Sequence, residues 1–61
     1  MKTYARPMSD DWPYLKAGQD YEVIEERDGQ FKVVDECGDH EWFKWADDHR
    51  CTFERVQEAM E

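Results

Sequence analysis

The stretch YEVIEERDGQFKV, residues 21–33, decides the fold of this chain. In its first half Tyr21 and Val23 lie on one face of an extended segment and a mostly charged set lies on the other, which is the alternation of a half-buried β-strand. Asp28-Gly29 follows, and this pair between two alternating runs is a strong signal for a hairpin, because both residues tolerate the positive φ of a tight turn. We therefore expect two antiparallel strands here: 20–26 and 30–36.

Further short runs on both sides of this hairpin indicate more strands. Before it lies a long irregular segment that ends in a turn, where Gly18 can take a positive φ. After it come a turn at Cys37-Gly38-Asp39 and a polar turn at 46–50. Residues 57–61 have helical composition but are too few to form a stable helix alone. The remaining expected elements are strands at 2–6, 40–45 and 51–56, and a short C-terminal helical turn.

Short strands, tight turns and a long first loop are typical of a small all-β barrel. Closing the sheet removes the exposed strand edges that a lone antiparallel sheet has to protect. The chain has 61 residues, which is enough for one domain at most. We expect a single domain over residues 1–61 that folds as an all-β, five-stranded barrel.

Four short motifs carry a resemblance to a known family. They are Leu15-x-Ala17-Gly18-x-x-Tyr21-x-Val23, Asp28-Gly29-x-Phe31-x-Val33, Gly38-x-x-x-Trp42 and Phe53-Glu54-x-Val56. Over residues 2–56 the chain resembles the SH3-like barrel, and especially the small acidic proteins of phages and prophages that use this fold. The resemblance implies a five-stranded barrel and a protein of phage or prophage origin.

The chain departs from peptide-binding SH3 domains at the positions that build their groove. Tyr4 is the only tyrosine in the first strand, Phe31-Lys32 replaces the paired tryptophans, and Trp45-Ala46-Asp47 stands where a proline and a tyrosine are expected. Recognition of proline-rich segments needs an aromatic-lined groove. We therefore do not expect a proline-rich ligand.

The charge of the chain is strongly unbalanced, with 16 Asp and Glu against 8 Lys and Arg and a formal net charge of −8. Three Trp, three Tyr and three Phe favour a folded domain, because disordered acidic chains are poor in aromatic residues. Nucleic-acid binding needs Lys and Arg to displace the counterions of phosphates, and no basic cluster is present. We expect a protein partner with a basic surface, and neither direct nucleic-acid nor membrane binding.

The location of the protein follows from two absent patterns. Residues 1–7 lack the apolar run of a signal peptide, and no apolar run approaches the ~20 residues of a membrane-spanning helix. We expect a cytoplasmic protein, in which Cys37 and Cys51 remain thiols rather than a disulfide.

No arrangement of residues in the sequence indicates catalysis. Carboxylates are numerous, but none stands in an apolar segment that would raise its pKa for acid–base work. Ser9 is the only serine, and the three glycines lie in separate turns, so neither an activated nucleophile nor a phosphate-binding loop is indicated. We expect a non-enzymatic protein without a cofactor.

Aromatic residues near acidic turns form the candidate binding site. A chain this small cannot bury all of its rings, and exposed Trp and Tyr are enriched at binding hot spots. An apolar anchor inside an acidic rim fits a partner protein with a basic surface. A more specific hypothesis for the function, which also uses the resemblance, is a phage-encoded inhibitor that occupies the basic site of a host nucleic-acid-handling or defence protein. The candidate residues are Trp12, Tyr14, Trp45, Asp10, Asp11, Asp47 and Asp48.

Two alternatives remain open at this point. In the first, Cys37, His40, His49 and Cys51 bind zinc, since Cys and His are its usual ligands and four of them complete a tetrahedron. A zinc ion would also stabilise so small a core. In the second, exposed aromatic residues form a homodimer, so that the protein is a self-associating accessory protein. Otherwise we expect a monomer or a weak homodimer.

Overall fold

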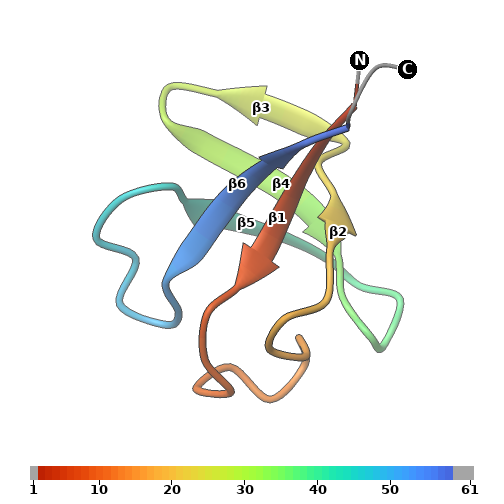
Figure 1. Ribbon diagram of the computed structural model, residues 1–61, viewed down its shortest axis with the longest axis vertical. Helices are drawn as coiled ribbons and strands as arrows, with labels where there is room; N and C mark the ends of the chain where they lie inside the picture. Colours follow the sequence, from red (N-terminus) through yellow and green to blue (C-terminus); the bar gives the residue numbers. More distant parts are fainter. Residues whose placement is uncertain (1, 59–61) are drawn as a thin grey trace.

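The computed structural model describes residues 2–58, and these residues form six β-strands and no helix (Figure 1). The expected all-β class is confirmed, but the expected number of five strands is wrong. In chain order, the strands are β1 (Thr3–Pro7), β2 (Tyr21–Glu22), β3 (Glu25–Arg27), β4 (Gln30–Val34), β5 (His40–Lys44) and β6 (Phe53–Gln57).

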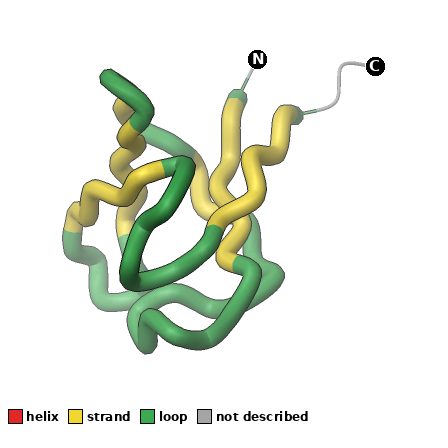
Figure 2. The backbone as a smooth tube through the Cα atoms, turned by 90° about the vertical axis from the view of Figure 1, so that its left-hand side faces the viewer, coloured by secondary structure: helices red, strands yellow, loops and turns green. Residues whose placement is uncertain are grey.

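The strands form two antiparallel three-stranded sheets, one in the order β2-β1-β6 and the other in the order β3-β4-β5. Figure 1 shows β1 and β6 crossing in front of β4 and β5. Figure 2, turned by 90°, shows β1 and β6 side by side as they run toward the two termini. The sheets therefore pack face to face, and their inward side chains form the core.

The extra strand arises because the segment expected as one strand, 20–26, bends and contributes to both sheets. The backbone N–H of Val23 donates to the carbonyl of Thr3 in the first sheet, and that of Ile24 donates to the carbonyl of Lys32 in the second. The chain changes sheets between these two residues, so β2 and β3 are separate strands. Two adjacent apolar side chains mark the corner: Val23 packs on the core, and Ile24 is 47% exposed.

The expected closed barrel is also wrong, because β5 and β6 do not pair. At the edge of β5, the N–H of Lys44 donates to the Asp48 carboxylate at 2.9 Å, and the carbonyl of Trp42 accepts a hydrogen bond from the Arg50 guanidinium. Two side chains from the loop before β6 thus satisfy backbone groups that a neighbouring strand would satisfy in a closed sheet.

The predicted C-terminal helical turn is wrong where it can be compared with the structure. Gln57 is the last residue of β6, and Glu58 lies beside Lys2, its N–H donating to the Lys2 carbonyl at 2.9 Å. Pairing with β1 satisfies this backbone better than five residues of isolated helix would. Residues 59–61 of the prediction lie outside the described part of the chain.

The Asp28-Gly29 turn lies where the sequence predicts it. Both residues have positive φ, 52° and 75°, as a two-residue hairpin turn with the twist of its flanking strands requires. This turn sets Arg27 opposite Gln30, which in turn sets Phe31 opposite Glu26. The register therefore places Phe31 and Val33 on the inner face of β4.

The core is built mainly from aromatic residues of both sheets. Phe31 and Phe43 stack at 5.8 Å between ring centroids, and Phe53 from the other sheet contacts them at 5.0 and 4.8 Å. Burial of such rings is the main source of stability available to so small a chain. The buried hydrophobic residues are Ala5, Leu15, Tyr21, Phe31, Val33, Phe43, Cys51 and Phe53.

Candidate functional site

The structure divides the predicted aromatic anchors into two clusters, which the core rings Phe43 and Phe31 connect. Trp12 and Tyr14 contact each other edge to face, with ring centroids 5.4 Å apart, and Trp12 also meets Phe43 at 6.3 Å. Trp12 is partly buried against the core, whereas Tyr14 is 45% exposed. Tyr14 is therefore the exposed ring of the first loop, and Trp12 supports it from below.

Trp45 belongs to the second cluster and joins the two sheets. Its ring packs on Phe31 at 4.0 Å, and its Nε1–H donates to Glu26 at 2.9 Å. The guanidinium of Arg55 lies over the same ring at 4.3 Å and pairs with the Glu26 carboxylate. These bonds from Arg55 and Trp45 lower the pKa of Glu26, against the opposing effect of partial desolvation. We call Glu26, Trp45 and Arg55 the inter-sheet clasp.

The carboxylate of Asp48 lies inside the structure. Its side chain is 2% exposed, and it accepts hydrogen bonds from the Lys44 and Arg50 N–H groups and from the Arg50 guanidinium. Burial alone would raise the pKa of Asp48, but these bonds outweigh it and lower the pKa to about 2. The hydrogen-bonding capacity of the Asp48 carboxylate is thus used at the edge of β5, and we do not include Asp48 in the binding surface.

The other three predicted carboxylates lie in exposed loops. Asp10 accepts a hydrogen bond from the Ala17 N–H at 3.2 Å, and Asp11 accepts one from the Ser9 hydroxyl at 3.0 Å. These bonds brace the first loop and leave each carboxylate in contact with solvent. Asp47 is exposed at a turn position with φ 60° in a different loop.

Glu36, which the sequence does not single out, is connected to the first loop by hydrogen bonds of its backbone and of its side chain. Its N–H donates to the Tyr14 carbonyl at 2.9 Å, and its side chain accepts the Tyr21 hydroxyl proton at 2.6 Å. The Tyr21 oxygen in turn accepts the Lys16 N–H at 2.8 Å. Burial and the bond to Glu36 raise the pKa of Tyr21. We call the set Asp10, Asp11, Tyr14 and Glu36 the acidic loop surface.

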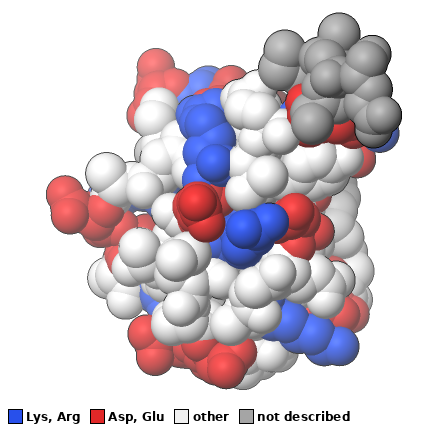
Figure 3. Space-filling model, in the orientation of Figure 1, with Lys and Arg blue, Asp and Glu red and all other residues white. Residues whose placement is uncertain are grey.

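Ion pairing leaves the loops with uncompensated negative charge. Within residues 2–58, six of the eight basic side chains form ion pairs: Lys2, Arg6, Arg27, Lys32, Arg50 and Arg55. No carboxylate of the acidic loop surface takes part in these pairs. Figure 3 shows Lys and Arg beside Asp and Glu over β1 and β6, and at the lower end of the molecule it shows a group of carboxylates with a basic side chain to its right.

The structure does not bring together the residues of the zinc alternative. Cys37 is an exposed free thiol, whereas Cys51 is buried with its sulfur 3.8 Å from the Ser9 carbonyl and 3.5 Å from that of Thr52. In the described part of the chain, no group of three or more His, Cys, Asp or Glu side chains is placed to hold a metal ion. His40, His49 and the two cysteines therefore do not form a zinc site in this fold.

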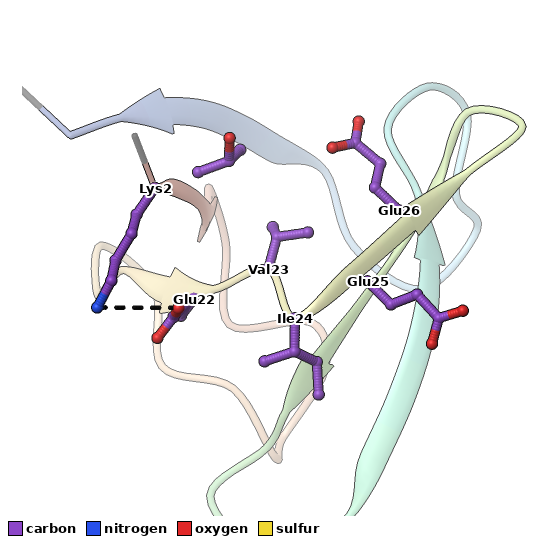
Figure 4. A pocket seen from close by; sticks show the side chains of 7 residues that line it. Lys2, Glu22, Val23, Ile24, Glu25 and Glu26 are labelled. Atoms are coloured by element: carbon purple, nitrogen blue, oxygen red, sulfur yellow. Dashed lines mark ion pairs between the residues drawn. The ribbon is translucent and has the colours of Figure 1, made fainter.

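A polar hollow at the corner between β2 and β3 offers no convergent chemistry. Figure 4 shows Glu22 pointing toward Lys2, with which it forms an ion pair at 4.0 Å, while Glu25 and Glu26 diverge on the other side of Ile24. Carboxylates that point apart cannot share a proton or a metal ion. This hollow therefore gives no support to a catalytic role.

Comparison of the chain with protein-family models, curated proteins and solved structures found no match. Residues 2–58 include no helix with the length and apolar character that crossing a membrane requires.

Proposed function

We propose that the protein is a non-enzymatic interaction module whose acidic loop surface docks on a basic surface of a partner protein. One observation carries the proposal: Tyr14, 45% exposed, stands in a braced loop among carboxylates that have no ion-pair partner within residues 2–58. Exposed tyrosines act as anchors because they bury a large area at a small entropic cost. Unpaired carboxylates around the anchor favour approach of a positive surface.

The bracing of the first loop strengthens this proposal. The Asp10 carboxylate accepts a hydrogen bond from the Ala17 N–H across the loop, and the Tyr14 carbonyl accepts one from the N–H of Glu36 in the β4–β5 turn. A loop held in place before binding loses less conformational entropy when the partner docks. Arg50 adds to this support, because its guanidinium lies 5.6 Å from the centre of the Trp12 ring.

A finer version of the fold belongs to the same proposal. The bent segment that serves both sheets, the long first loop and the pairing of β1 with β6 support an SH3-like arrangement without a closed ladder. We further propose a cytoplasmic inhibitor of phage or prophage origin, monomeric or weakly dimeric, which occupies the basic site of a host nucleic-acid-handling or defence protein. The net charge of −8 supports this choice of target.

Charge reversal on the proposed surface tests the function. We expect immobilised native protein to retain a cellular partner at low salt, and the variant Asp10→Lys/Asp11→Lys/Tyr14→Ala to lose it while circular dichroism stays unchanged. The control Glu22→Lys/Glu54→Lys reverses two charges whose ion pairs are long, 4.0 and 3.7 Å, and should still bind. The retained protein is then purified and titrated calorimetrically. A partner that binds all three chains equally contradicts the proposal.

A further inference from the structure

The outer face of the β3-β4-β5 sheet carries basic and aromatic side chains, in contrast to the acidic loop surface. Phe31, Val33 and Phe43 point inward, so their neighbours along β4 and β5 point outward. The register sets Lys32 directly opposite Trp42, and Lys44 follows Trp42 on the same face. An aromatic ring and two lysines thus share one exposed face of an otherwise acidic protein.

Trp42 lies among cationic groups. The Arg27 guanidinium is 5.1 Å from the centre of its ring and the Lys32 ammonium is 5.6 Å away. Glu25 pairs with both cations, at 3.2 Å each. Lys44 is exposed and forms no ion pair with any residue in the described part of the chain. With Asp28, which lies at the turn beside Trp42, this face therefore presents three cations against two carboxylates.

A hollow of about 380 Å³ opens beside the Trp42 ring, lined by Arg27, Asp28, Gln30 and Trp42. Its volume lies within the ~300–1,000 Å³ of pockets that accept a side chain or small ligand. Three of its residues belong to the β3–β4 hairpin, which Figure 1 places at the upper end of the molecule, whereas the first loop lies at the lower end. The hollow is therefore separate from the acidic loop surface.

We propose that this face is a second docking surface, for a short acidic segment of a partner protein. One apolar or aromatic side chain of the segment enters the hollow against Trp42, and flanking carboxylates pair with Arg27 and Lys44. Charge complementarity favours this occupant, because the cations Arg27, Lys32 and Lys44 outnumber the carboxylates of Glu25 and Asp28 on this face. The inference is independent of the proposed function. Its sequence signal was the alternation that puts Trp42 and Lys44 on one face of β5.

A protein segment fits this face better than a nucleic acid. Duplex DNA carries one negative charge per ~1.7 Å, so many phosphates would lie within the ~8–10 Å reach of the remaining charge of the chain. That charge is −8 overall, and it repels a long polyanion. A segment with two or three carboxylates meets the local cations and experiences much less of this repulsion.

The test uses labelled peptides and nuclear magnetic resonance. The probe is a decapeptide in which Glu alternates with Leu and Phe, and its control has Gln in place of Glu. We expect the Glu peptide to shift the Trp42 indole N–H signal and the amides of Arg27, Lys32 and Lys44. The Trp42 signal is assigned from the spectrum of Trp42→Phe. The Gln peptide should bind at least about fivefold more weakly, because the attraction of the cations is lost.

Two variants with the same charge change separate this surface from the rest of the molecule. Lys44→Glu should weaken binding of the Glu peptide about tenfold, while Lys16→Glu, in the first loop, should leave it unchanged. Both lysines are exposed and lie outside the described ion pairs, so both variants should fold. The proposal is overturned if the peptide shifts only loop signals, if the two variants behave alike, or if a ten-nucleotide oligo(dT) binds this face and the peptide does not.

Discussion

Asp48 and Arg50 together occupy the open edge of β5. The Asp48 carboxylate accepts from the N–H of Lys44, and the Arg50 guanidinium donates both to that carboxylate and to the Trp42 carbonyl. An unpaired strand edge is a template for association with another chain. This pair of side chains covers the edge with groups of the molecule's own loop.

Replacing Asp48 should therefore weaken the fold. In Asp48→Asn the buried hydrogen bonds to Arg50 lose the negative charge of the carboxylate. The new amide N–H also points at groups that are themselves donors. We therefore expect a loss of about 2–3 kcal/mol in the free energy of unfolding. Urea denaturation followed by tryptophan fluorescence measures it. The neighbouring Asp47→Asn is the matched control, because Asn also tolerates the positive φ at this exposed position, and it should change stability by less than about 0.5 kcal/mol.

The Asp48 carboxylate should also make the free energy of unfolding depend on pH. Asp48 has an ordinary pKa of 3.8 and one of about 2 in the fold. Between these values the unfolded chain binds more protons than the folded chain, so stability rises with pH. The contribution, about 2 kcal/mol, is complete above pH 4–5 and is lost as pH falls toward 2. Urea midpoints measured from pH 2 to 6 should show this slope, and Asp48→Asn should flatten it. An unchanged slope in that variant would contradict the assignment.

The indole N–H of Trp12 allows the cost of a buried, unsatisfied hydrogen-bond donor to be measured. The Nε1 atom of this indole is buried and has no hydrogen-bond partner among the residues that the structure describes. Such a donor costs roughly 1–3 kcal/mol of stability. Trp12→Phe removes the donor and keeps most of the ring, so we expect the free energy of unfolding to change by less than about 1 kcal/mol, whereas Trp12→Ala should cost about 3 kcal/mol. Equal losses in the two variants would show that the N–H has a partner in solution.

The inter-sheet clasp can be compared with a neighbouring surface pair. Glu26 binds Arg55 and Trp45 and ties the two sheets together, whereas Glu25 pairs only with cations of its own sheet. The Glu26 side chain is 35% exposed, so solvent screens its charge, and we expect Glu26→Gln to cost about 1 kcal/mol. Glu25→Gln should cost less than about 0.5 kcal/mol. Thermal denaturation of both variants, followed by circular dichroism, decides between them.

The elements set by local chemistry could be predicted from the sequence. The Asp28-Gly29 turn and the alternation around Phe31 and Phe43 gave the strands and most of the core. The bend at Val23 could not be predicted, because two adjacent apolar residues continue a strand pattern as well as they mark a corner. The open edge of β5 was also hidden, since charged side chains such as Asp48 and Arg50 look like loop surface in a sequence.

The candidate site was predictable only in part. Tyr14 was found because its loop holds aromatic residues beside acidic ones. Glu36 was missed because its link to Tyr14 is a contact between distant segments, with no local signal. The sequence predicts one patch of Trp45 and Tyr14, because some rings must be partly exposed and Trp45 shares a strand face with Phe43; the Trp45 ring and its N–H are instead both used in joining the sheets.

The pairing of β1 with β6 has a practical consequence for how the molecule can be attached to something else. Thr3 lies opposite Gln57, and Glu58 hydrogen-bonds to Lys2, so the first and last described residues are neighbours at the end of the molecule away from the first loop (Figure 1). A tether, a dye or a fusion protein joined at either place would leave Tyr14 facing outward. A short linker between the two places would make a ring-closed version, in which new ends could be opened elsewhere.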